Sequence, residues 1–100
     1  MDITNDAYEF IKQESSTFKY DPVVMVFERV FQGWCGQSKA VTASIVDKKM
    51  LANDSDFIVQ YGAKCLVPIW IEKNLQYLVD KTIVDVAGWD TFRRLIVVPN

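Results

Sequence analysis

Apolar and polar residues follow helical spacing in the first part of the chain. Asn5 or Asp6 can cap a helix that ends near Ser15, because polar, turn-forming residues follow it up to Pro22. One face of this helix carries apolar side chains three and four positions apart, namely Ala7, Tyr8, Phe10 and Ile11. The pattern therefore predicts a short amphipathic helix ahead of the first proline.

The next segment, residues 22–34, is strongly apolar and fits two structures. Asp21 followed by Pro22 is a favourable helix start, and large apolar residues recur at helical spacing as far as Trp34. The run over residues 23–27 is rich in β-branched side chains and equally suits a buried strand. The pattern places this segment in the core and leaves helix and strand open.

The middle of the chain gives one helix and one strand. Residues 39–46 contain Ala and Thr and are predicted as a short helix capped by Ser38. Residues 65–71 form an apolar run with Pro68 in its middle. A proline inside such a run marks the beginning or the edge of a strand, so we predict a strand there.

The last quarter of the chain again leaves a choice. Residues 75–87 carry a helical apolar stripe, but their second part, residues 82–86, also suits a strand. After Gly88, Asp90 can cap a final short helix that ends before Pro99.

Composition decides between an all-helical and a mixed fold. The chain has 13 Val and 8 Ile but only 5 Leu, and β-branched side chains are favoured on pleated surfaces. With 100 residues, half of them hydrophobic, the chain should form one domain over residues 1–100. We therefore predict an α+β fold in which a short mixed sheet packs against about three helices, with an all-α bundle as the alternative.

Several classes of chemistry are disfavoured by the residues the chain lacks. It has no His, which removes the usual general base and the commonest metal ligand. Two cysteines, Cys35 and Cys65, are too few for a zinc site within one chain, and we expect both to be free thiols. We therefore expect no metal, no cofactor and no catalytic residue.

Charge and targeting signals bear on partners and location. The net charge is −2, and the 11 Lys and Arg residues are scattered, which disfavours direct nucleic-acid binding and suits a partner with a basic surface. The start of the chain lacks the basic and apolar regions of a secretory signal, and no apolar run approaches the roughly 18 to 20 residues of a membrane span. We expect a cytoplasmic protein that does not contact a membrane.

One short motif suggests an alternative function. Residues 34–38 read Trp-Cys-Gly-Gln-Ser, and this W-C-G-x-S pattern resembles the W-C-G-x-C active site of the thioredoxin family. Further features come in the order found in that family: an N-terminal helix, Pro22 before an apolar run, Tyr61-Gly62, Val67-Pro68 and Gly88. The resemblance implies that Cys35 is a nucleophile ahead of a helix, that Ser38 occupies the resolving-cysteine position, and that Pro68 is a cis-proline facing the thiol. Such a protein would carry out monothiol redox chemistry.

The main hypothesis is a non-catalytic protein-binding module, such as an inhibitor, an immunity-type protein or an adaptor. The chain has 13% aromatic residues, many for a small domain, and Trp and Arg are enriched where binding energy concentrates. We therefore predict that Trp70, Trp89, Arg93 and Arg94 contact a partner. An exposed apolar patch would also favour self-association as a symmetric dimer.

Overall fold

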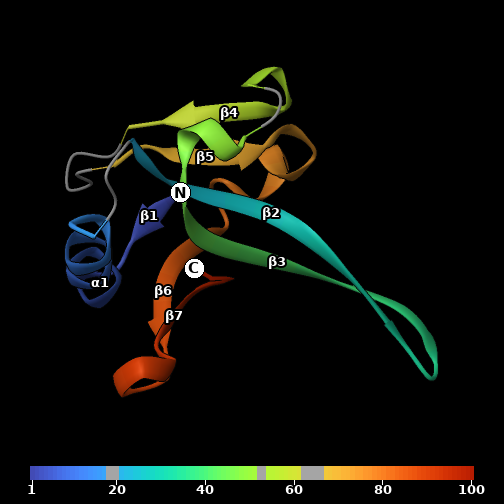
Figure 1. The fold of residues 1–100 in the computed structure, drawn as a ribbon. Coiled ribbons are helices and arrows are strands. Elements are labelled where there is room, and N and C mark those ends of the chain that lie inside the picture. Colours follow the sequence, from blue (N-terminus) through green and yellow to red (C-terminus); the bar gives the residue numbers. More distant parts are fainter. Residues whose placement is uncertain (18–20, 52–53, 62–66) are drawn as a thin grey trace.

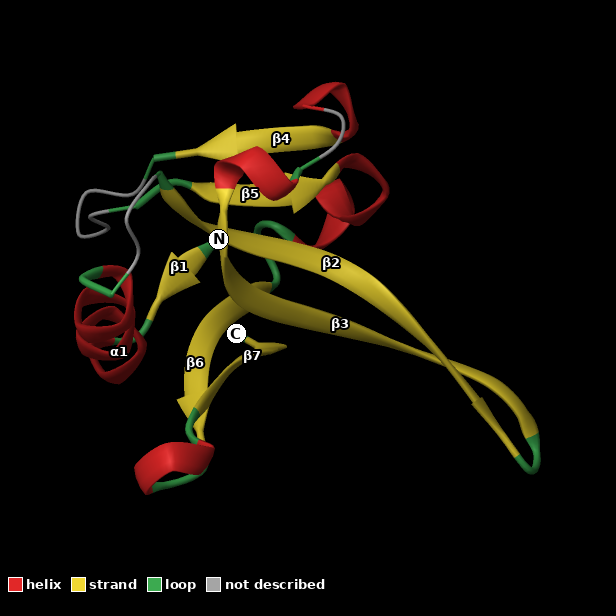
Figure 2. Ribbon diagram, viewed as in Figure 1, coloured by secondary structure: helices red, strands yellow, loops and turns green. Residues whose placement is uncertain are grey.

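A curled, seven-stranded sheet forms most of the protein (Figures 1 and 2). This computed structural model describes residues 1–17, 21–51, 54–61 and 67–100. The strands are β1 (Asp2–Ile3), β2 (Pro22–Gly33), β3 (Gly36–Asp47), β4 (Phe57–Gln60), β5 (Ile69–Glu72), β6 (Thr82–Ala87) and β7 (Arg94–Pro99). The other elements are helix α1 (Asn5–Ser15) and the 3-10 turns η1 (Lys48–Met50), η2 (Asp54–Asp56), η3 (Lys73–Leu78) and η4 (Asp90–Phe92).

The predicted α+β fold with three helices is wrong, and so is the all-α alternative. The strands form a half-barrel with the order β1-β6-β7-β3-β2-β5-β4, and α1 is the single α-helix among the described residues. The high Val and Ile content correctly indicates strands, and strands also form in segments predicted as helices. Residues 22–34, left open by the pattern, are strand up to Gly33, and residues 75–87 divide between η3 and β6.

The helix predicted over residues 39–46 is instead the main part of β3. Ala43 is buried, and Val41 and Ile45 pack against the same core, whereas Thr42 and Ser44 alternate with them along the strand. A period of two places apolar side chains on one face of a strand. This alternation outweighs the helical propensity of the Ala residues and the capping capacity of Ser38.

The helix predicted after Gly88 is also wrong. Asp90 begins a 3-10 turn of three residues, and the chain then returns as β7. Gly88 and Asp90 both have positive φ angles, +89° and +54°, which bend the chain sharply at this point. The reversal allows β7 to pair antiparallel with β6 over six residues, from Thr82↔Pro99 to Ala87↔Arg94.

The first helix is confirmed. α1 spans Asn5–Ser15, and its buried side chains, Ala7 and Ile11, belong to the predicted apolar face. Its N-cap is Thr4, whose Oγ1 accepts a hydrogen bond from the Ala7 amide at 3.1 Å. The strand predicted around Pro68 is present as β5, which begins directly after that proline, while residues 65 and 66 lie outside the described residues.

The core lies on the inner face of the curled sheet, where β2 and β5 are its most deeply buried strands. Helix α1 packs its buried face onto it. Buried members include Ala7, Ile11, Val24, Val26, Ile69, Ile71, Leu75, Val84 and Leu95. The curvature also brings the two outermost strands together, because the Gln60 side chain in β4 bonds to the backbone N and O of Met1, next to β1, at 2.8 and 2.6 Å.

The β2–β3 hairpin extends far beyond this core (Figure 1). Its two strands pair continuously from Pro22↔Asp47 to Gly33↔Gly36. The half of the hairpin next to the core, residues 22–28 and 41–47, is partly or fully buried, whereas residues 29–40 are exposed throughout. We call residues 29–40 the arm.

Candidate functional site

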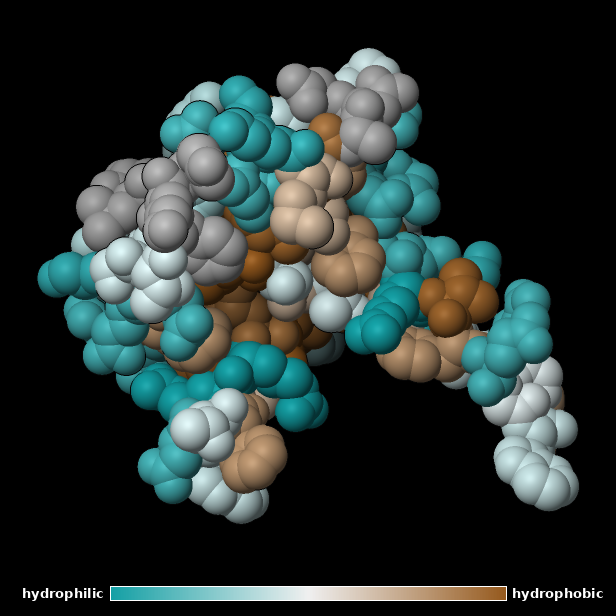
Figure 3. All heavy atoms as spheres, viewed as in Figure 1, coloured by the Kyte–Doolittle hydropathy of each residue, from teal (hydrophilic) through white to brown (hydrophobic). Residues whose placement is uncertain are grey.

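A groove opens between α1 and the strands β3 and β7. These two strands pair in register only at Thr42↔Ile96 and then separate. The space between them has a volume of about 220 Å³. It is lined by Phe10, Glu14, Ala43, Ser44, Ile45, Arg93, Arg94 and Leu95. In Figure 3, apolar atoms lie at the bottom of a hollow near the centre of the molecule, with hydrophilic atoms along its lower rim.

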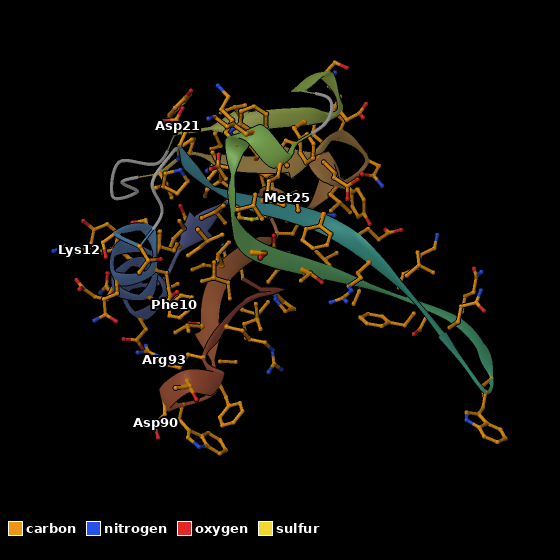
Figure 4. All side chains as sticks on the ribbon, in the orientation of Figure 1. Phe10, Lys12, Asp21, Met25, Asp90 and Arg93 are labelled. Atoms are coloured by element: carbon orange, nitrogen blue, oxygen red, sulfur yellow. The ribbon has the colours of Figure 1, made fainter. Side chains whose placement is uncertain are left out.

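Two arginines stand on one wall of the groove. The Arg93 guanidinium carbon lies 5.6 Å from the centre of the Phe10 ring, a cation–π contact that links the start of β7 to α1 (Figure 4). Glu14 lies one helical turn after Phe10 on the same helix. Within the part of the chain that the structure describes, neither Arg93 nor Arg94 forms a salt bridge, and both are exposed. Their donors are free to meet a carboxylate from outside.

Two exposed aromatic side chains flank this wall. Trp89 and Phe92, at the two ends of the turn around η4, are 75% and 76% exposed. The turn depends on Gly88, because a Cβ at this position would collide with the carbonyl oxygen of Phe92. The bend therefore keeps both rings outside the core and close in sequence to Arg93.

Three of the four predicted partner-binding residues, Trp89, Arg93 and Arg94, thus lie at one corner of the molecule. Trp70 lies apart from them, in β5, and is only 5% exposed. Its ring packs against Phe57 at 5.9 Å between centroids, and the Lys48 ammonium lies 5.5 Å from it. The Trp70 indole N–H has no hydrogen-bond partner among the described residues.

Sequence reasoning missed Phe10 and Glu14 as members of the site. Their spacing of four residues places them on one face of a helix, and this signal is visible in the sequence. Their position in one groove with residues 93–95, however, depends on how β7 returns to the sheet after the Gly88 turn. That long-range arrangement leaves no pattern in the sequence.

The W-C-G-x-S motif lies at the tip of the arm, far from the groove. Trp34 and Cys35 form the two-residue turn of the β2–β3 hairpin, and Gly36 has a φ of +111°. A strand, not a helix, follows Cys35, so the helix terminus expected to favour its thiolate is missing there. Ser38 lies in β3.

Pro68 is not brought near Cys35. The Val24 amide donates a hydrogen bond to the Pro68 carbonyl oxygen at 3.0 Å, which places Pro68 at the base of the hairpin. From Val24 to Gly33 the strand extends about 30 Å at 3.3 Å per residue. No cis peptide bond occurs in the described ranges, so the bond before Pro68 is trans. The thiol and proline arrangement that the thioredoxin resemblance implies is not formed, and Cys65 lies outside the described residues.

No protein-family model matches this sequence, and no curated protein matches it either. Over residues 1–17, 21–51, 54–61 and 67–100, no helix is long and apolar enough to cross a bilayer.

Proposed function

We propose that the protein is a non-catalytic protein-binding module and that the groove, with Trp89 and Phe92 beside it, is its binding surface. The observation that carries this proposal is that Arg93 and Arg94, neither of which forms a salt bridge within the described residues, stand beside the apolar residues that line the groove. In protein interfaces, Trp and Arg side chains around an apolar centre contribute a large share of the binding energy.

The groove indicates the chemistry of the partner segment. A guanidinium binds a carboxylate through two parallel hydrogen bonds, and Arg93 is already held in place by the Phe10 ring. The partner should therefore bring an Asp or Glu side chain to Arg93 and Arg94, and an apolar side chain to Leu95 and Ile45. The basic partner surface expected from the net charge of −2 stays a separate prediction.

The polar groups of the groove suit recognition better than catalysis. Besides the guanidiniums they are the Glu14 carboxylate and the Ser44 hydroxyl. Nucleophilic catalysis needs a hydroxyl in hydrogen-bond contact with a base. No such contact of Ser44 occurs in the described part of the chain.

The test is affinity capture from native lysate followed by calorimetry with the captured protein. Trp89→Ala combined with Arg93→Ala should lower the affinity for the captured protein at least tenfold, since each removes a hot-spot contact. Tyr77→Ala is the matched control, because Tyr77 is an aromatic residue of η3, 64% exposed, that does not line the groove. Its affinity should equal that of the wild type.

Two results would contradict the proposal. One is equal affinity of the groove variant and the wild type, provided that both have the same thermal unfolding midpoint. The other is capture through a reducible bond that Cys35→Ser abolishes, which would favour a thiol-based function at the tip of the arm.

A further inference from the structure

The arm exposes strand edges that pair with nothing else in the described residues. On the β2 side, pairing with β5 ends at Val26↔Ile71. On the β3 side, pairing with β7 is confined to Thr42. Beyond these points the hairpin is a two-stranded ribbon, and such a ribbon presents unpaired N–H and C=O groups along both edges.

One hydrogen bond fixes which backbone groups point outward from β2. The Glu28 amide donates to Glu72 Oε1 at 2.7 Å, so it points away from β3. In an antiparallel pair, successive residues alternate between pointing toward and away from the neighbouring strand. Val30 and Gln32 therefore direct their N–H and C=O groups outward, while Arg29 and Phe31 direct theirs toward β3.

We propose that this edge of β2 pairs with the same edge of a second copy of the chain, in antiparallel register centred on Phe31. In this register Val30 of each copy lies opposite Gln32 of the other. Both residues point outward, so the two pairs form four N–H···O=C hydrogen bonds. The two Phe31 residues face each other as a non-hydrogen-bonded pair with Cα atoms about 4.5 Å apart. An edge that meets its own copy in this way gives a closed twofold dimer.

Hydrogen bonding disfavours the register centred on Val30, and charge disfavours one pairing through the β3 edge. A register centred on Val30 would need the Glu28 amide, which Glu72 already occupies. The β3 edge would place Lys39 opposite Lys39 when centred on that residue, and directly opposed like charges destabilise a sheet. In the Phe31 register Arg29 lies opposite Gly33, so no like charges oppose each other.

The side chains of the arm also favour pairing with a second copy of the chain. Val30 is 51% exposed and Phe31 43% exposed, and pairing would cover part of both. The Arg29 guanidinium already lies 5.3 Å from the centre of the Phe31 ring, so a second ring beside the first would extend this cation–π contact. The paired edge is short, and the area it buries falls at the low end of interfaces, so we expect a weak, reversible dimer.

Cysteine cross-linking tests the register directly. In a background of Cys35→Ser and Cys65→Ser, Phe31→Cys should form a disulfide-linked dimer under mild oxidation, because about 4.5 Å between Cα atoms lies within the disulfide range. The control is Ser38→Cys, which lies directly across from Phe31 on β3. In the proposed dimer the two Ser38 positions are about 14 Å apart, three strand spacings, so cross-linking should be at least tenfold slower.

Sedimentation equilibrium of the unmodified chain provides a second measurement. We expect a monomer–dimer equilibrium whose dissociation constant rises at least tenfold with Phe31→Lys, which brings two ammonium groups face to face, and changes little with Ser38→Lys. Equal cross-linking rates at residues 31 and 38 would overturn the proposal. So would a monomer at every concentration. Loss of the groove partner in the capture experiment would not affect either result, because the arm and the groove share no residue.

Discussion

The β2–β3 hairpin places one continuous ladder of strand pairs in two environments. At its base, Val23, Val24 and Val26 are fully or almost fully buried. In the arm, Val30 and Phe31 are about half exposed and Trp34 is entirely exposed. Backbone pairing between the strands is the same in both halves. The base of the hairpin packs against α1 and β5, whereas within the described ranges each strand of the arm pairs only with the other.

This difference shows that apolar residues alone do not indicate a core. The run Val-Phe at residues 30 and 31 resembles the run at the base, yet both side chains are exposed. Burial is decided by whether helix α1 or another strand reaches the segment. An isolated two-stranded ribbon is marginally stable in water, so an arm of this length should be stabilised further by contacts that another molecule provides.

The largest effect is expected from glycine substitutions in two turns, the Gly88 turn next to the core and the Gly36 turn of the arm. Gly88→Ala should destabilise the protein by about 3 kcal/mol, because it adds a collision with the Phe92 carbonyl to the strain of a positive φ. Gly36→Ala should cost about 1 kcal/mol, since φ is again positive but a Cβ would meet no atom within 4 Å. Urea unfolding of the two variants measures this difference. Equal losses would mean that the Gly88 turn relaxes without cost.

A matched pair of valines in β2 gives the next largest effect. Val24→Ala should lower the free energy of unfolding by about 2 to 3 kcal/mol, because it removes buried methyl groups and leaves a cavity. Val30→Ala should lower it by about 0.5 kcal/mol, since it loses mainly strand propensity. Denaturant unfolding at a concentration where the protein is monomeric checks both values. A loss at Val30 comparable to that at Val24 would show that the arm packs against the body.

A smaller effect is expected where the base meets the arm. Glu72→Ala should cost about 1 kcal/mol, because the half-buried Glu28 amide loses a charged acceptor at 2.7 Å. Glu72→Gln keeps an acceptor oxygen and should recover most of that stability. Hydrogen exchange should accelerate at the Glu28 amide in the Ala variant. Unchanged exchange there would indicate that another group protects this amide.

The sequence predicts local elements better than the way they combine. The helix over residues 5–15 is confirmed because its apolar side chains recur at helical spacing, although its N-cap is Thr4 and not the predicted Asn5 or Asp6. The Ala content and Ser38 predict a helix over residues 39–46, although Val41, Ala43 and Ile45 alternate with polar residues at the period of a strand. If this alternation is given more weight than the Ala content, the sequence predicts the strand β3.

The candidate site shows the same division. Trp89, Arg93 and Arg94 were predicted from residue type, and they lie together because they are neighbours in sequence. Phe10 joins them only through the return of β7 against α1, a contact between residues 83 positions apart that no local pattern records. Trp70 has the same side chain as Trp89 but is buried, with the Lys48 ammonium next to its ring. Residue type alone therefore does not distinguish the buried tryptophan from the exposed one.

The smallest expected effect concerns the tip of the arm. Trp34→Ser should change the free energy of unfolding by less than about 0.5 kcal/mol, because the Trp34 side chain is fully exposed. The emission lost with this substitution should be that of a water-exposed indole, readily quenched by acrylamide. Trp70→Phe, by contrast, should remove a shielded, blue-shifted component, because Trp70 is 5% exposed. If Trp34→Ser instead removed shielded emission at high protein concentration and exposed emission on dilution, the tip of the arm would be covered in the dimer. The tip lies only three residues beyond Phe31, so this outcome would extend the proposed arm interface to the hairpin turn.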